Sequence, residues 1–342
     1  MVAELDRARG RGGLSRLLSA VSIAALAIGA CKGEARSPSA PAPAGEAERT
    51  PAVGLTAAPV GPGTAQPATV VLLEPGKEPR TVLRYSLSPS AREKLGLTMT
   101  MAMEMGLAGH NMRMQVPPIH MENELAVAEK LGEREVLCRF AITSAELLPG
   151  GDKIFESARG QLEAELKKTV GTHGTLAVDD RGLNLRLDLA LPAGMDPQMS
   201  QAMQSSRQAL EHVSSPLPEE AVGVGARWQM DQSIEHDGIK MKQKVSYELV
   251  ELKGQRAQLH ATIEQTADPQ VATMPGLPPG LRAELLSHTG SGSGTIDIDL
   301  SKLVPTSSSS TIHTETSIKV TGQGQDQTML MKADSKVEIS RL

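Results

Sequence analysis

The sequence predicts an α+β fold that is mainly antiparallel β and contains two similar strand-meander units with covering helices. Three observations favour this class. Apolar and polar residues alternate strictly over residues 95–105, a pattern from the first half of the chain returns in the second, and helical spacing is confined to short segments. Two such units are compatible with a curved, half-barrel-like sheet whose helices cover the concave side.

The composition limits the classes of function that the chain can serve. Its 342 residues carry a formal charge of −5 and no basic stripe, which argues against a nucleic-acid partner. Sixteen methionines accompany only one Trp, two Tyr and two Phe. Because the methionine side chain is unbranched, a core rich in it conforms to irregular gaps, which suits either a deformable pocket or an ordinary core.

Residues 1–30 read as a lipoprotein signal peptide. Four arginines precede an apolar run over residues 17–30 that is too short and too broken to span a membrane comfortably. The following Ile28-Gly29-Ala30-Cys31 resembles the bacterial lipobox. This resemblance implies that Cys31 is diacylated, that the preceding peptide is removed and that the new N-terminus is acylated. An ordinary signal peptide with a chance cysteine is the alternative.

Residues 31–78 are predicted to be the acylated cysteine and a disordered tether. The segment is rich in Ala, Pro and Gly, has no aromatic residue and cannot bury enough apolar surface to offset the chain entropy. A short strand at residues 70–73 is an additional possibility. Lys32, where some bacteria use Asp to retain lipoproteins in the inner membrane, favours the outer membrane of the cell envelope.

Residues 79–215 are predicted to form the first β-rich unit, which begins with a methionine-lined hairpin. In a strand, alternate residues share one face, so the apolar members of residues 95–105 would all point the same way. The alternation resumes after a breaker that contains Gly109 and Asn111. The predicted apolar lining of this unit consists of Met99, Met101, Met103, Met105, Met112 and Met114.

The remainder of this unit contains strands near residues 123–127 and 136–142 and a helix near residues 152–170. A second hairpin is expected around residues 180–182, and a second helix after Asp196, with Pro197 at its first position. Cys138 lies on an apolar strand face. It has no intrachain partner if Cys31 is acylated, so we expect a small buried hydrophobe.

Residues 216–342 are predicted to repeat the first unit. The glycines and methionines of the first hairpin recur 129 residues later, and further matches follow at separations of 122, 119 and 120 residues, as small deletions in a duplicated unit would produce. The hairpin matches are Gly96 with Gly225, Met101 with Met230, Gly109 with Gly238, and Met112 with Met241. The repeat adds Trp228, Met230 and Met241 to the predicted apolar lining. It also predicts that the second unit has its own covering helix near residues 281–285.

One phrase at the start of the second unit is similar to a known family. Residues 218–228 place Pro218, Val222, Val224, Gly225 and Trp228 in a Pro-x-x-x-Val-x-Val-Gly-x-x-Trp arrangement. Together with the lipobox, the tether and the methionine hairpin, this phrase resembles an uncharacterised family of bacterial envelope lipoproteins. That resemblance implies no known activity. The plan is also similar, at the level of fold, to half-barrel lipoprotein carriers that enclose an apolar cavity.

The sequence favours a non-catalytic, lipid-anchored envelope protein that binds an apolar small molecule or a protein partner. A structural surface lipoprotein with a filled core is one alternative. Cu(I) binding through the methionine hairpin is another, since thioethers are soft ligands. The positions that match Met99, Met103 and Met105 hold Trp228, Gln232 and Ile234, which indicates a need for bulk rather than for sulfur.

Enzymatic signatures are weak, and we expect neither an enzyme nor a cofactor. The eight histidines are dispersed without an H-E-x-x-H pairing. The register of residues 290–294 does not give G-x-S-x-G, and the aspartate pairs at 179–180 and at 297 and 299 offer too few oxygens for a calcium loop.

Overall fold

The computed structural model describes residues 68–89, 91–107, 110–192, 215–236, 239–272, 280–322 and 325–342. The predicted signal peptide, Cys31, most of the predicted tether and the helix expected after Asp196 lie outside the described residues, so these remain predictions. In the part of the chain that is described, no helix is long and apolar enough to cross a membrane.

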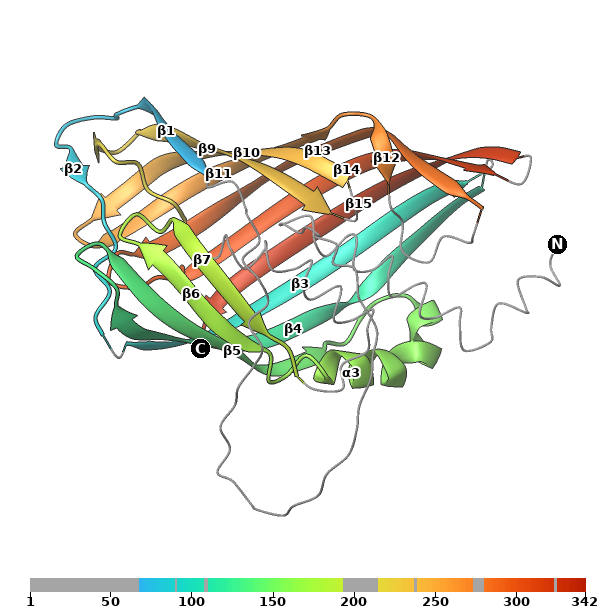
Figure 1. Ribbon diagram of the computed structural model, residues 1–342, viewed down its shortest axis with the longest axis horizontal. Helices are drawn as coiled ribbons and strands as arrows, with labels where there is room; N and C mark the ends of the chain where they lie inside the picture. Colours follow the sequence, from blue (N-terminus) through green and yellow to red (C-terminus); the bar gives the residue numbers. More distant parts are fainter. Residues whose placement is uncertain are drawn as a thin grey trace, which may run out of the picture.

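One large antiparallel sheet of 13 strands dominates the molecule (Figure 1). Its strand order is β1-β9-β10-β11-β13-β14-β15-β3-β4-β5-β6-β7, with β12 paired to β13, and β1 and β7 are its edges. The strands of the first half are β3 (Arg92–Leu107), β4 (His110–Lys130), β5 (Glu135–Leu147), β6 (His173–Asp179) and β7 (Asn184–Ala190). The others are β1 (Thr69–Glu74), β9 (Arg227–His236), β10 (Ile239–Lys253), β11 (Arg256–Ala267), β12 (Gln270–Ala272), β13 (Arg282–Asp299), β14 (Ser307–Gly322) and β15 (Gln325–Arg341). The short strands β2 (Thr81–Val82) and β8 (Ala221–Val222) form a separate pair.

The two halves of the sheet have matching hairpins. Met103 lies opposite Met114 between β3 and β4, and Gln232 lies opposite Gln243 between β9 and β10. Both members of the second pair lie 129 residues after those of the first, so the repeat found in the sequence holds in the strand register. The prediction of a mainly antiparallel, internally repeated fold is therefore confirmed.

The joint between the two halves is a long strand pair. β15 pairs with β3 from Met329 opposite Leu107 to Arg341 opposite Leu95. Residues from both predicted units therefore share one continuous sheet. The sheet curves so strongly that β6 and β7 lie in front of β15 and β3 in the view of Figure 1.

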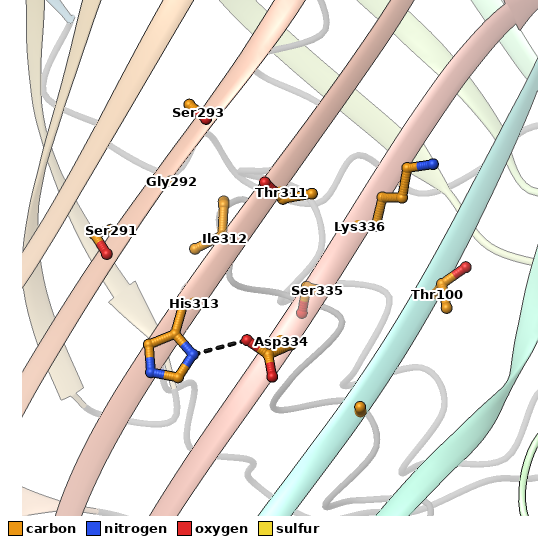
Figure 2. Close-up of a pocket in the computed structure, with 11 residues that line it drawn as sticks. Thr100, Ser291, Gly292, Ser293, Thr311, Ile312, His313, Asp334, Ser335 and Lys336 are labelled. Atoms are coloured by element: carbon orange, nitrogen blue, oxygen red, sulfur yellow. Dashed lines mark hydrogen bonds and ion pairs between the residues drawn. The ribbon is translucent and has the colours of Figure 1, made fainter.

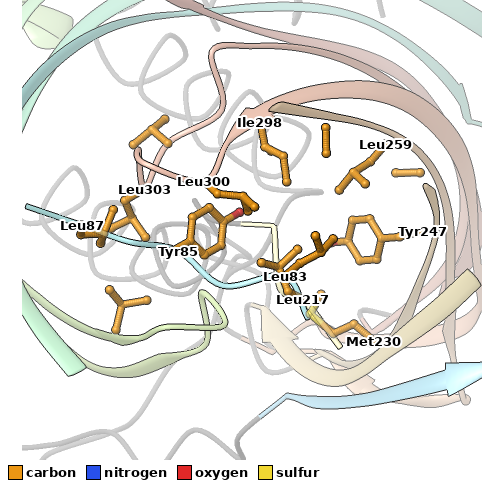
Figure 3. Close-up of a cluster of buried hydrophobic side chains, with 14 of the residues drawn as sticks. Leu83, Tyr85, Leu87, Leu217, Met230, Tyr247, Leu259, Ile298, Leu300 and Leu303 are labelled. Carbon is orange, nitrogen blue, oxygen red and sulfur yellow. The ribbon is translucent and has the colours of Figure 1, made fainter. Parts of the chain in front are cut away.

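One end of the concave side is filled by a hydrophobic cluster that we call the aromatic core (Figure 3). Trp228 and Tyr247 stack with their ring centroids 5.7 Å apart. A segment of chain that carries Leu83, Tyr85 and Leu87 runs across the inside of the curve and packs against the sheet. The aromatic core also includes Met230, Leu249, Leu259, Ile298, Leu217, Leu300 and Leu303.

Two hydrogen bonds satisfy the side-chain polar atoms of Tyr85 and Trp228 in the aromatic core. Tyr85 Oη donates to the carbonyl oxygen of Ser215 at 2.9 Å, and Trp228 Nε1 donates to that of Pro216 at 2.9 Å. Buried tyrosine and tryptophan side chains usually find such partners, because an unpaired polar atom in the interior is costly. The bond from Trp228 attaches the chain before β8 to the sheet, and the bond from Tyr85 attaches it to the segment that crosses the inside of the curve.

A 3-10 turn and a short helix cover the methionine hairpin, where the sequence predicts one helix over residues 152–170. They are η2 (Lys153–Ala158) and α3 (Arg159–Lys167). Phe155 is buried in a cluster that we call the methionine core, and Leu162 packs against it. The buried members of this cluster are Met101, Met103, Met114, Val116 and Phe155.

The helix predicted near residues 281–285 is wrong, because this stretch is part of β13. Ala283 and Leu285 are buried while their neighbours are exposed, which is the two-residue period of a strand. β12 and β14 flank the stretch on either side and pair with it. The short strand offered at residues 70–73 is present as β1, which pairs with β9, so the end of the segment predicted to be disordered is ordered.

Candidate functional site

Three glutamines line up across neighbouring strands on the concave face. Gln232 of β9 lies opposite Gln243 of β10, which lies opposite Gln265 of β11, and we call these residues the glutamine row. They share the face of Met230 and Tyr247, which Figure 3 shows on the inside of the curve. Gln243 is 8% exposed and Gln265 is 2% exposed. Gln243 and Gln265 are therefore buried polar side chains with apolar neighbours on the same strands.

The hydrogen bonds of the glutamine row leave one amide without a partner. Gln265 Nε2 donates to Gln243 Oε1 at 2.6 Å. Gln232 Oε1 and Nε2 are both enclosed and have no hydrogen-bond partner among the described residues. Buried side-chain amides are satisfied in most proteins, so the amide of Gln232 is an exceptional group.

A glycine makes room for the far end of the row. Gly290 of β13 lies opposite Gln265. A Cβ atom at position 290 would lie 2.8 Å from Gln265 Oε1, so a larger residue would displace the amide. Gln265 thus lies over β13, while Gln232 ends the row on the side of β9.

Apolar side chains flank the glutamine row on both sides. Met230 pairs with Val245, and Val245 with Ile263, two residues along the strands in one direction. Ile234 pairs with Met241 in the other direction. Residues two apart on a strand are about 6.6 Å apart, so apolar surface begins one side chain away from the amides.

The structure places the predicted lining residues on this face but divides them between two packed clusters. Met101, Met103 and Met114 are buried in the methionine core, and Met105 packs against it. Trp228 and Met230 belong to the aromatic core. Met99 and Met241 are half-buried, and Met112 is 46% exposed near the tip of its hairpin.

The methionine hairpin brings thioethers together in pairs. Met103 lies opposite Met114, and Met105 lies opposite Met112. Phe155 packs on the buried members of this group. Because these sulfur atoms are part of a filled cluster, the packing favours a hydrophobic core over a Cu(I) site.

A histidine also faces the concave side. His288 Nδ1 lies 2.8 Å from Thr316 Oγ1, and its Nε2 is enclosed without a partner. Burial lowers the pKa of His288, because the charged imidazolium loses its hydration. The neutral ring is therefore favoured at this position.

The outer face of the sheet has a hollow of about 570 Å³ (Figure 2). Ser291, His313 and Asp334 lie opposite one another on β13, β14 and β15. His313 Nδ1 lies 2.7 Å from Asp334 Oδ1, but Nε2 lies 3.5 Å from Glu315 Oε1. In a hydrolase triad this second nitrogen faces the serine, so the row of three residues differs from a triad.

Sequence reasoning noticed Gln232 only as the counterpart of Met103. The sequence signal for Gln243 and Gln265 was that each of three successive strands has a glutamine at an inward position. That signal could be read only with the register of β10 against β11, which places Gln243 opposite Gln265.

Comparisons with known proteins identify a family match in one part of the chain. Residues 191–302 match a family of unknown function (DUF6263). The matched stretch begins before β8 and ends after β13, so it contains all three members of the glutamine row. The family brings no activity with it. A comparison with curated protein sequences finds no match.

Several solved structures show weak similarity. OccK8 (OprE) of Pseudomonas aeruginosa is 6% identical, with 75% of this chain and 99% of that chain covered, at a TM-score of 0.20. The outer membrane protein OmpT of Vibrio cholerae is 4% identical, with 73% of this chain and 100% of that chain covered, at a TM-score of 0.17. The translocator domain of the autotransporter NalP of Neisseria meningitidis is 8% identical, with 73% of this chain and 88% of that chain covered, at a TM-score of 0.14. Similarity at this level assigns neither a fold nor a location to this chain.

Proposed function

We propose that this chain is a non-catalytic envelope lipoprotein that holds an apolar molecule against the concave face of its sheet. The observation that carries the proposal is the chemistry of that face. Met99, Met241 and Met331 lie half-buried on it, outside the buried parts of the clusters. Binding sites for small molecules are mostly apolar concave surfaces with a few placed polar groups, and the glutamine row supplies such groups.

The proposed anchor is the acylated Cys31. Each buried CH₂ group contributes about 0.8 kcal/mol to membrane binding, so two or three acyl chains hold a protein firmly on a bilayer. Replacing the cysteine by Cys31→Ser should remove the mass of the acyl chains and release the chain from the membrane fraction. An unchanged mass and an unchanged membrane fraction would contradict the anchor and leave binding at the concave face untouched.

Native mass spectrometry of the intact chain tests the binding function. The chain is extracted from the cell envelope, transferred into an amphipathic polymer without free detergent, and measured before and after denaturation. We expect an added mass that denaturation releases as an apolar compound. A bare lipoprotein mass would instead favour a structural lipoprotein with a filled core, which the packing of the aromatic core also suits.

A pair of variants makes this measurement specific to the concave face. Met241→Lys places a charge among the half-buried residues of that face, and we expect it to reduce the retained mass. Thr262→Lys adds the same charge on the exposed, opposite face of β11 and should leave the retained mass unchanged. Equal retention in both variants would place the bound molecule elsewhere.

A further inference from the structure

We infer that the molecule held on the concave face contains an amide group between two apolar segments, and that Gln232 binds this amide. The inference rests on the proposed function and names the class of ligand. The ligand is thus an amide-linked acyl compound rather than a plain hydrocarbon.

The first argument is the unsatisfied amide of Gln232. Both of its polar atoms are enclosed, yet neither has a partner in the part of the chain that the structure describes. Gln243, its neighbour in the row, is paired instead with Gln265, whose Nε2 donates to Gln243 Oε1. An enclosed polar group without a partner costs folding free energy, and a ligand that pairs with it recovers that cost.

The second argument concerns the chemistry that fits Gln232. Its Nε2 group donates hydrogen bonds and its Oε1 atom accepts them, so a full complement needs a carbonyl oxygen and an N–H group. A secondary amide supplies both. An ester supplies only an acceptor, and an ether only a weak one.

The third argument is the position of Gln232 between apolar neighbours. Met230 precedes it on the inward face of β9, and Ile234 follows it. Met241 lies opposite Ile234 and is half-buried. A ligand whose amide reaches Gln232 therefore meets apolar side chains in both directions, which is why the amide is placed within the chain and not at its end.

A matched series of ligands tests the inference. The intact chain in an amphipathic polymer is loaded with the fluorescent probe N-phenyl-1-naphthylamine. N-hexyloctanamide, hexyl octanoate and hexyl octyl ether, which have equal chain lengths, are then used to displace the probe. We expect the amide to bind about tenfold more tightly than the ether, since one net hydrogen bond is worth about that factor, with the ester between them.

Variants of Gln232 test whether its side chain causes the preference for the amide ligand over the ether. Gln232→Leu and Gln232→Met should bind the amide and the ether equally while keeping the affinity for the ether. Gln229→Leu, on the same strand but on the opposite face, should keep the tenfold preference. Equal binding of all three ligands by the unaltered chain, or a preference that survives in both Gln232 variants, would overturn the inference and leave the proposed function standing. Failure of every ligand to displace the probe would count against both.

Discussion

His313 of β14 has acidic partners on β14 and on the neighbouring β15, on the outer face of the sheet. Its ring lies between Asp334 and Glu315, and Glu315 in turn receives a hydrogen bond from Lys332 at 2.6 Å. The hydrogen bond with Asp334 is the main cause of a raised pKa for His313, and that with Glu315 contributes. Protonation of this histidine therefore strengthens the contact between β14 and β15.

This arrangement predicts a pH-dependent contribution to stability. Because the pKa of His313 is higher in the folded chain than in the unfolded chain, the contribution is complete below the unfolded value and disappears as pH rises through the folded value. His313→Gln should lower the melting temperature at pH 5.5 and leave it unchanged at pH 9. The ring is 45% exposed, so the effect should stay below about 1 kcal/mol.

A double-mutant cycle tests whether Asp334 is the partner of His313. Asp334→Asn should cause a similar loss at pH 5.5, and combining it with His313→Gln should add little, since both changes remove the same interaction. Additive losses at pH 5.5 would show that the two residues act independently.

The glutamine row predicts opposite effects from two similar substitutions. Gln232→Leu removes an enclosed amide that has no partner, so it should stabilise the ligand-free chain by about 1 kcal/mol. Gln243→Leu removes the acceptor of the bond from Gln265 Nε2 and should destabilise the chain by about 1–3 kcal/mol. Urea unfolding of the two variants measures both values, and a loss of stability in Gln232→Leu would contradict the assignment of its amide as unpaired.

At the scale of elements, packing against the methionine core holds η2 in position. Phe155 is 6% exposed and packs among the buried methionines of β3 and β4. Phe155→Ala should lower the free energy of unfolding by about 3 kcal/mol, because it leaves a cavity over the sheet. Ile154→Ala, which changes a 54% exposed neighbour, should have little effect on urea unfolding. Similar losses in both variants would argue against the packing described for η2.

A stripe of glycines lets β13 and β14 approach each other closely. A Cβ atom at position 292 would lie 2.4 Å from the carbonyl oxygen of Thr311. Gly292→Val should therefore destabilise the sheet by more than about 1 kcal/mol. Ser293→Val, on the exposed face of the same strand, is the control. Thermal unfolding of both variants checks this, and equal melting temperatures would show that the strands can separate at no cost.

The elements that could be predicted from the sequence are those fixed by local periodicity. The alternation over residues 95–105 was enough to predict the strand β3. The four-residue spacing of Leu162 and Leu166 was enough to predict the helix α3. Residues 281–285 match that helical stretch in sequence, yet they form a strand because β12 and β14 pair with them. The inner position of Tyr85 was also unpredictable, since it depends on a hydrogen bond to a residue 130 positions away.

At the scale of the whole molecule, the two sequence-related halves share one sheet and should unfold together. Trp228 is buried in the second half, and the thiol of Cys138 is buried in the first, where burial raises its pKa to about 12. In a Cys31→Ser chain, tryptophan fluorescence and the reactivity of the remaining thiol should therefore change at the same urea concentration. Two separated transitions would show that the halves unfold as independent domains.

The pairing of β15 with β3 has a consequence for biogenesis. β3 is among the first strands to leave the ribosome, and its partner β15 is the last. Until the C-terminus has been delivered, the backbone hydrogen-bonding groups along that side of β3 have no partner strand, and such an unpaired edge invites association with other chains. The full sheet can therefore form only after β15 has been synthesised.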